Sequence, residues 1–389
     1  MTAACVMLVA AEPSGDALGA GLAAALRERL GEGVRFVGVG GPLMAAQGVD
    51  SPFDISGLSV LGVTDALRAY PAVLRAARRT ADIAARERPE VAVLIDSWGF
   101  NLRVARRLRR LAPRPRLIKF VAPQVWATRP GRARTLARAV DRLLTIHAFD
   151  APLFEAEGLA TTFVGNPVLD KDISGADPHR LFATLGIAED SPVLLILPGS
   201  RRGEVDRLLP PFEDAAGLLK AERPELSIVV AAADAVAESV RQRVEAWRTS
   251  AFVVQGEAAR IDAMKAATAA LACSGTVTTE LALCGAPMVV AYRLGALTHA
   301  VVKRLIRTPY ITLFNIAAGR FVAPEFVQER CSGPALAQAL AALLDDPAVR
   351  AGQIEAQFAS LDLMRGGVTD PSGAAADAVI DELGRARKG

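Results

Sequence analysis

The chain is poor in the residues that build disulfide frameworks and metal sites. Its 389 residues include only four cysteines and three histidines. The cysteines show no CxxC spacing, which predicts reduced, buried thiols rather than disulfides or a zinc site. The histidines lie far apart along the chain, so we expect no histidine metal site. The cysteines are Cys5, Cys273, Cys284 and Cys331.

Long apolar runs and a strong net charge are also missing. No stretch approaches 18 apolar residues without a charge, so we expect no membrane-spanning helix. The first apolar run is short and has no basic segment before it, which argues against a signal peptide. We therefore expect a cytoplasmic protein that is still able to touch a bilayer. The net charge of +3 is mildly basic and argues against a dedicated nucleic-acid binder.

Hydrophobic residues, in contrast, make up 51% of the chain. With this length they predict two domains rather than one core. Short apolar runs alternate with longer segments of helical spacing, which predicts an α/β fold with parallel sheets and right-handed crossovers. The predicted strands are residues 6–10, 34–39, 91–95, 117–121, 143–146, 162–164, 193–197, 226–230, 252–254, 269–272 and 287–291.

A break between the domains is visible in GNPVLDKDISGADPHR, residues 165–180. It has little apolar periodicity, and Asp177 is placed to cap a helix that begins at Pro178. We predict an N-terminal domain of residues 1–170 and a C-terminal domain of residues 171–367. Residues 368–389 are predicted to form a C-terminal helix, and a return to the N-terminal domain is one option. Two doubly wound sheets would face a cleft, with ligands bound beyond the carboxyl ends of the strands.

The first two loops carry weak signals. Glu12–Asp16, EPSGD, follows the first strand. Gly15 permits a tight backbone there, and Ser14 or Asp16 can cap the next helix. A plain capped turn explains these residues equally well. The loop at residues 38–48, GVGGPLMAAQG, lacks the GxGxxG spacing, which disfavours a nicotinamide enzyme.

Three later loops carry stronger signals. Asp96 ends an apolar strand, where limited solvation suits a general base, although a helix cap is the alternative. LPGSRR, residues 197–202, joins a strand to a helix through a Gly-Ser turn and two arginines, which suits phosphate binding more than an ordinary exposed turn. Ser-Gly-Thr at 274–276 precedes Glu280 by one helical turn. That carboxylate can accept ribose hydroxyls, although helix capping alone is another explanation.

The order of motifs resembles the lipid-A-disaccharide synthase family over nearly the whole chain. The motifs are EPSGD, GVGGPLM, IDSWGFN, APQVWATRPGR, FVGNP, LPGSRRGEV, SGTVTTE, PMVVAYR and APEFVQE. This family is similar to inverting GT-B glycosyltransferases, which have two Rossmann-like domains. The resemblance implies a UDP-diacylglucosamine donor, a diacylglucosamine 1-phosphate acceptor, and a β-linked disaccharide and UDP as products. It implies no metal, no cofactor and no nucleic acid, but contact with the cytoplasmic face of the inner membrane; a homodimer is left open.

The resemblance also assigns residues. Asp96 matches the family's essential aspartate and Arg201 its phosphate-loop arginine, and both are expected to be catalytic. Glu280 matches the ribose-binding glutamate, and Asn315 an asparagine near the uridine. The other residues expected to bind substrate are Glu12, Ser14, Gly15, Asp16, Trp126, Gly199, Ser200, Arg202, Ser274, Gly275 and Thr276. The chain departs from the family's usual pattern at Ala11, Trp98, Gly99, Asn166 and Phe314.

Other functions remain as alternatives: a nucleotide-sugar epimerase or another UDP-sugar transferase on the same fold, and a non-catalytic lipid or nucleotide sensor. Substrate use separates them, because an epimerase acts on a sugar nucleotide without an acceptor lipid. Intact Asp96, Arg201 and Glu280 argue against a sensor.

A separate segment, residues 57–79, mixes apolar residues with arginines. Pro71 is predicted to divide it into two short helices. Such a mixture suits a segment that lies on anionic lipid, although a core-facing amphipathic helix is the alternative. The arginines are Arg68, Arg75, Arg78 and Arg79.

Overall fold

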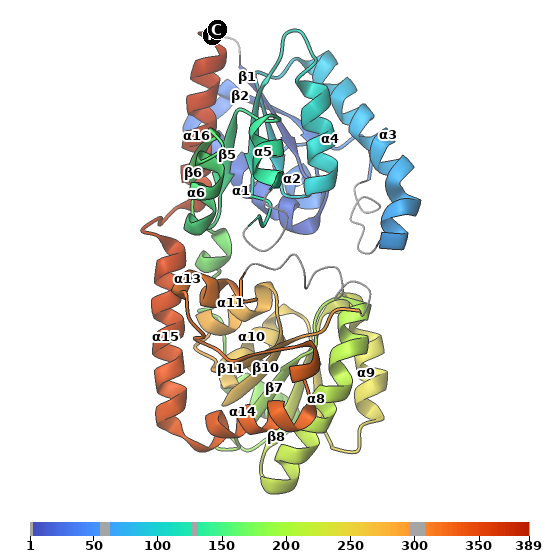
Figure 1. The fold of residues 1–389 in the computed structure, drawn as a ribbon, viewed down its shortest axis with the longest axis vertical. Helices are drawn as coiled ribbons and strands as arrows, with labels where there is room; N and C mark the ends of the chain where they lie inside the picture. The colour runs from blue at the N-terminus through green and yellow to red at the C-terminus, as the bar shows by residue number, and fades with distance from the viewer. Residues whose placement is uncertain (1–2, 55–62, 126–130, 296–307, 389) are drawn as a thin grey trace. The chain divides into compact units, whose positions relative to one another are not determined.

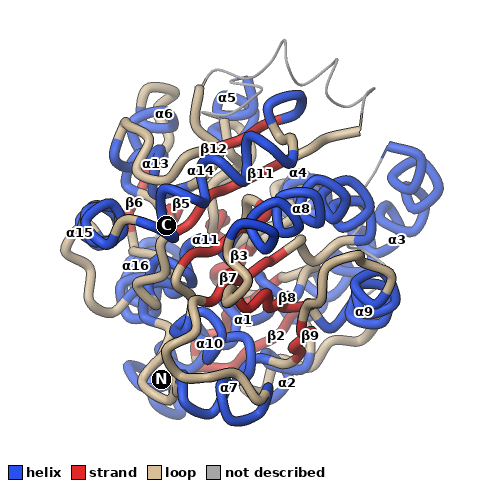
Figure 2. Tube along the Cα trace, turned by 90° about the horizontal axis from the view of Figure 1, so that it is seen from below, coloured by secondary structure: helices blue, strands red, loops and turns tan. Residues whose placement is uncertain are grey.

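A computed structural model describes residues 3–54, 63–125, 131–295 and 308–388 (Figure 1). The chain forms two compact units: unit 1 comprises Met1–Pro167 and Arg365–Gly389, and unit 2 comprises Val168–Met364. Each unit contains a six-stranded sheet, and helices flank the strands (Figure 2). All the described strand pairs are parallel, which confirms the predicted α/β class.

The sheet of unit 1 has the strand order β2-β1-β3-β4-β5-β6. Since β2 lies on one side of β1 and β3 on the other, the winding direction changes between β1 and β3. Ligands of open parallel sheets bind at the carboxyl ends beside such a switch point. The strands are β1 (Ala4–Val9), β2 (Val34–Val39), β3 (Val91–Ile95), β4 (Arg116–Phe120), β5 (Arg142–Thr145) and β6 (Ala160–Phe163).

Alternate residues of these strands enter two different apolar layers. Leu8 and Val93 pack with Leu22 of α1 and Val379 of α16 on one face, while Leu94 packs with α3 and α4 on the other. This arrangement follows from the two-residue period of a strand. The helices of unit 1 are α1 (Pro13–Leu30), α2 (Pro42–Ala46), α3 (Val63–Glu87), α4 (Trp98–Leu108), α5 (Gly131–Ala137), α6 (Ala151–Glu155) and α16 (Pro371–Ala386).

The C-terminal helix α16 packs against α1, although more than 300 residues separate them in the sequence. Glu382 of α16 is fully buried and pairs with Arg116 of β4 at 2.7 Å. Arg387 pairs at 2.6 Å with Glu90, the residue immediately before β3. The end of the chain therefore completes the core of unit 1 rather than that of unit 2 (Figure 1).

The prediction that Pro71 separates two short helices is wrong. Helix α3 runs from Val63 to Glu87 with Pro71 inside it. A proline within a helix removes one backbone hydrogen bond and costs about 3 kcal/mol. The turns after Pro71 offset this cost, because Ala77 and Thr80 are fully buried and the helix packs against α4. The part of the predicted lipid-facing segment before Val63 lies outside the described residues.

The sheet of unit 2 has the order β12-β11-β10-β7-β8-β9. Its winding direction changes between β7 and β10, so the loops that follow these two strands meet at one edge of the sheet. The strands are β7 (Val193–Leu197), β8 (Ser227–Ala232), β9 (Phe252–Gln255), β10 (Ala269–Cys273), β11 (Met288–Tyr292) and β12 (Glu325–Val327).

One prediction about the helices of unit 2 is confirmed. Asp177 caps the helix that begins at Pro178, with its carboxylate accepting the amide of His179 at 3.0 Å. The chain is helical from Gly333 onward apart from short connections. The four cysteines are free and buried, as predicted. The helices are α7 (Pro178–Leu185), α8 (Arg202–Glu222), α9 (Ala237–Glu245), α10 (Glu257–Ala266), α11 (Thr276–Leu283), α13 (Leu313–Ala318), α14 (Gly333–Asp345) and α15 (Pro347–Arg365).

Among the described helices of both units, none combines the length and the apolar character needed to cross a membrane.

Candidate functional site

The first cluster of polar side chains lies where β1 and β3 of unit 1 end. Asp96 directly follows β3 and is partly exposed. Ser14, in the first turn of α1, donates its hydroxyl to Oδ2 of Asp96 at 3.0 Å. A Cβ on Gly15 would lie 3.3 Å from Cβ of Ala10 and 3.5 Å from the carbonyl oxygen of Ile95. The glycine therefore lets α1 begin close to the end of β3, which brings Ser14 to Asp96.

The backbone of Asp96 is in the left-handed region, with a φ of +50°, and the next residue, Ser97, has a φ of +35°. Residues other than glycine seldom adopt this conformation, although Asp tolerates it better than most. Asn101 stabilises it by donating its amide to the carbonyls of Ile95 at 2.7 Å and Asp96 at 3.0 Å. Backbone strain of this kind clusters at active sites.

The sequence suggested that Ser14 or Asp16 caps α1, but neither side chain does so. The N-cap is Glu12, and no side chain accepts a capping hydrogen bond there. The buried carboxylate of Asp16 instead accepts backbone amides at the start of α2, because the first amides of a helix have no partner within it. These amides belong to Gly41 at 2.8 Å, Leu43 at 3.0 Å and Met44 at 3.0 Å. Asp16 thus ties the loop after β2 to α1.

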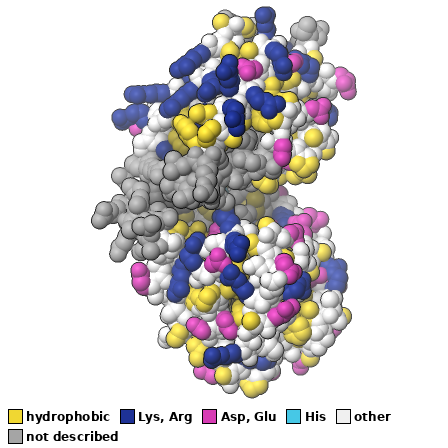
Figure 3. All heavy atoms as spheres, turned by 90° about the vertical axis from the view of Figure 1, so that its right-hand side faces the viewer, with side chains coloured by type: hydrophobic (Ala, Val, Ile, Leu, Met, Phe, Trp, Pro, Cys, Tyr) yellow, Lys and Arg dark blue, Asp and Glu magenta, His cyan; other side chains and the backbone are white. Residues whose placement is uncertain are grey.

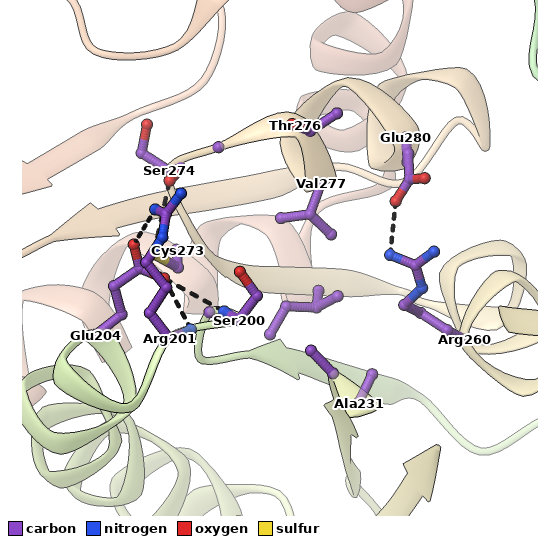
Figure 4. A pocket seen from close by; sticks show the side chains of 14 residues that line it. Ser200, Arg201, Glu204, Ala231, Arg260, Cys273, Ser274, Thr276, Val277 and Glu280 are labelled. Carbon is purple, nitrogen blue, oxygen red and sulfur yellow. Dashed lines mark hydrogen bonds and ion pairs between the residues drawn. The ribbon is translucent and has the colours of Figure 1, made fainter. Parts of the chain in front are cut away.

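The second cluster surrounds a cavity of about 270 Å³ in unit 2 (Figure 4). The N-terminal ends of α8 and α11 reach its wall, and the positive ends of their dipoles favour an anionic ligand. Arg260 and Glu204 also line it, although the sequence analysis had not singled them out. The predicted residues that line the cavity are Gly199, Ser200, Arg201, Ser274, Gly275, Thr276 and Glu280.

The loop after β7 is held by a carboxylate of its own chain. Oε2 of Glu204 accepts the amides of Ser200 at 3.2 Å and Arg201 at 3.3 Å, and its Oε1 accepts Nη1 of Arg201 at 2.8 Å. Gly199 has a φ of +109°, and a Cβ there would lie 2.7 Å from Oε2 of Glu204. The carboxylate of Glu204 therefore occupies these two loop amides and already orients Arg201.

Glu280 lies toward the other end of the cavity, where two cations hold it (Figure 4 draws one, Arg260). Arg260 of α10 donates to Oε2 at 2.8 Å, and Lys171 donates to Oε1 at 2.7 Å. Burial lowers the pKa of Lys171, but its hydrogen bonds to Glu257 and Glu280 outweigh this effect, so the pKa is raised overall. An ionised carboxylate has about four acceptor positions. Glu280 therefore keeps capacity for further donors such as hydroxyls.

Two predicted residues of unit 2, Asn315 and Arg202, do not line this cavity. Asn315 is fully buried, and its amide donates to Glu325 at 2.8 Å and accepts from the backbone of Val322 at 2.7 Å. Both ends of this amide are thus used to join α13 to β12 and to the loop before it. Arg202 is exposed at the first turn of α8, outside the lining of the cavity. Trp126 lies outside the described residues.

Three cations that no sequence pattern marked lie beside the predicted carboxylates: Lys119 near Asp96, and Arg260 and Lys171 at Glu280. None of them belongs to a local motif, because each meets its carboxylate through the tertiary fold. For Lys119 a signal was present. A lysine inside the apolar strand RLIKF is out of place unless it has a buried partner.

Comparison with known proteins identifies the family. Residues 6–366 match the family model described as lipid-A-disaccharide synthetase. The lipid-A-disaccharide synthase of Rhodospirillum centenum is 43% identical over 378 residues, which cover 97% of this chain and 94% of that protein. The corresponding protein of Paramagnetospirillum magneticum is 42% identical over 379 residues, which cover 97% of each chain.

Solved structures with a similar fold are much more distant in sequence. The S. aureus MnaA–UDP co-structure is 12% identical with a TM-score of 0.66, covering 99% of this chain and 97% of that one. A UDP-GlcNAc 2-epimerase from Neisseria meningitidis bound to UDP-GlcNAc is 12% identical with a TM-score of 0.60, and the match covers 99% of this chain and 100% of that one. These likenesses establish the two-domain α/β fold of GT-B type UDP-sugar enzymes. The family match and the close relatives go further: this chain belongs to the lipid-A-disaccharide synthase family of glycosyltransferases.

Proposed function

We propose that this chain transfers diacylglucosamine from UDP to the 6-hydroxyl of diacylglucosamine 1-phosphate, with inversion and without a metal. Family membership over residues 6–366 carries this proposal. The acceptor oxygen forms a bond to the anomeric carbon as the bond from that carbon to the diphosphate breaks. The electron pair of the broken bond stays with UDP, and the hydroxyl proton passes to a base. The products are the β-linked disaccharide and UDP.

Asp96 is the base in this scheme. It is partly exposed, which gives it access to a substrate hydroxyl, and it lies beside the switch point of its sheet. The hydroxyl of Ser14 fixes one of its carboxylate oxygens, which leaves the other for the acceptor. A positioned general base contributes about 100- to 10,000-fold to a rate. We assign residues 1–170 to acceptor binding on this basis.

The cavity of unit 2 binds the donor in this scheme. Arg201 and the N-terminal end of α11 supply positive potential for the diphosphate, so that the charge developing on the leaving group is stabilised by protein donors. Glu280, oriented by Arg260 and Lys171, accepts the ribose hydroxyls. We assign residues 171–367 to donor binding.

We also propose that unit 1 touches anionic lipid at the cytoplasmic face of the inner membrane, since both substrates carry acyl chains. The arginines Arg75 and Arg78 of α3 are exposed, and Tyr70 is 47% exposed. Lys and Arg side chains gather over unit 1 on the face shown in Figure 3. Cations near an anionic surface contribute about 1 kcal/mol each.

The test is incubation of the purified chain with UDP-diacylglucosamine, with and without diacylglucosamine 1-phosphate, followed by mass spectrometry. We expect a disaccharide and one UDP per disaccharide, only when the acceptor is present. Conversion of the donor without acceptor would point to an epimerase or hydrolase. Binding of the donor without any product would point to a sensor.

A further inference from the structure

A buried lysine lies directly behind the proposed base. Lys119, in β4, is 3% exposed. Its ammonium donates to the carbonyl of Asp96 at 2.6 Å and to the carbonyl of Phe120 at 2.9 Å. The charged groups that face it are Asp96, at the end of β3, and Glu12, at the start of α1. Lys119 is therefore attached to the residue whose carboxylate is proposed to take the proton, but through its backbone.

Burial of this lysine lowers the stability of the folded state. Burial lowers its pKa to about 7, although the negative charges of Asp96 and Glu12 partly oppose this shift. The two carbonyls that it contacts do not depend on it alone. The Asp96 carbonyl also accepts the Asn101 amide, and the Phe120 carbonyl accepts the Asp96 amide at 2.9 Å. A methionine of similar shape would leave both carbonyls with a partner and would remove a buried charge.

A residue that opposes stability yet contacts an active-site backbone is a candidate for a functional role. The left-handed conformation of Asp96 fixes the direction in which its carboxylate leaves the end of β3. Asn101 and Lys119 meet at the carbonyl of this residue from two different elements, α4 and β4. Without the lysine, the Asp96 carbonyl would keep the side-chain amide of Asn101 as its donor but would lose the ammonium.

We propose that Lys119 is a positioning residue for glycosyl transfer: its ammonium clamps the Asp96 carbonyl and so holds the carboxylate in the orientation that accepts the acceptor's proton. This inference rests on the proposed function. A carboxylate displaced by about 1 Å from its productive place loses about 100-fold in rate. Substrate binding does not need this orientation, so the effect falls on kcat rather than on KM.

The experiment compares Lys119→Met with Lys220→Met in the disaccharide assay. Lys220 is a matched control, because it also donates to two backbone carbonyls, those of Pro224 and Leu226, both at 2.7 Å, but in unit 2 and outside the cavity. We expect kcat of Lys119→Met to fall roughly 10- to 100-fold, with both KM values within about threefold of wild type. Lys220→Met should keep kcat within about twofold.

The pH dependence separates positioning from a structural role. As pH rises through about 7, Lys119 loses its proton, and the neutral amine has fewer donors and no charge for the clamp. The ratio of wild-type to Lys119→Met kcat should therefore be largest near pH 6 and shrink toward pH 9. Urea unfolding should show that Lys119→Met is at least as stable as wild type at pH 6.

Three results would overturn the proposal: an unchanged kcat, a constant ratio across pH, or a loss of kcat that only accompanies a loss of stability. Failure of the proposed function looks different, because wild type itself would then yield no disaccharide. Wild-type activity together with unaffected Lys119→Met activity refutes the role of Lys119 alone.

Discussion

Replacement of Glu280 by glutamine should weaken donor binding while sparing the chemical step. The substitution keeps the shape of a side chain that is only 11% exposed, but it removes the charge that Arg260 and Lys171 hold in place. Hydrogen bonds to charged groups contribute about 1.5–3 kcal/mol, so the Kd for UDP should rise roughly 10- to 100-fold. Ribose hydroxyls do not change charge in the reaction, so kcat should stay within about threefold.

Titration calorimetry with UDP measures this change directly. Glu257→Gln is a matched control, because Glu257 also pairs with Lys171, at 2.6 Å, but does not line the cavity. That control should bind UDP within about twofold of wild type. A Glu280→Gln variant with unchanged UDP affinity, or a control that loses as much affinity as Glu280→Gln, would refute the assignment of the ribose to this carboxylate.

Three further predictions concern stability and the membrane. Asp16→Ala should lower the free energy of unfolding by about 1–2 kcal/mol in urea, since α2 loses its cap; an unchanged midpoint would contradict this. For Lys119, the folded pKa of about 7 lies below the ordinary 10.5. The unfolded chain therefore binds more protons between these values, and wild type should gain stability over Lys119→Met as pH rises from 7 to 10.5, by at most roughly 5 kcal/mol; parallel pH profiles would contradict this. The double variant Arg75→Gln/Arg78→Gln should bind anionic vesicles more weakly at low salt, with a smaller difference at high salt; equal binding in flotation assays would refute lipid contact there.

The strands were largely predictable because both faces of each sheet are covered. Burial on two sides makes a strand a continuous apolar run, and the runs at 91–95 and 193–197 begin and end where the structure places β3 and β7. Strand β12 was missed, since three residues at a sheet edge give too short a pattern. The long helix through Pro71 was missed because packing against α4 outweighs a local helix breaker.

The partners of the candidate site residues were less predictable than the residues themselves. The sequence indicates that Asp16 is a helix cap, but it does not indicate that the capped helix is α2. The amides of Gly41 and Met44 come close to Asp16 only in the folded chain. It likewise gives no sign that Arg260 meets Glu280. A local pattern records which side chain follows a strand, whereas the sheet order decides which other loops lie beside it.

The central claim is that Asp96 is the base for transfer from a UDP donor to a lipid acceptor. The most direct measurement is the single-turnover rate of disaccharide formation by Asp96→Asn, with the Kd for UDP measured on the same preparation. We predict a rate about 100- to 10,000-fold below wild type, with the Kd for UDP unchanged. A rate within about threefold of wild type, which corresponds to roughly 0.6 kcal/mol in the barrier, would contradict the claim.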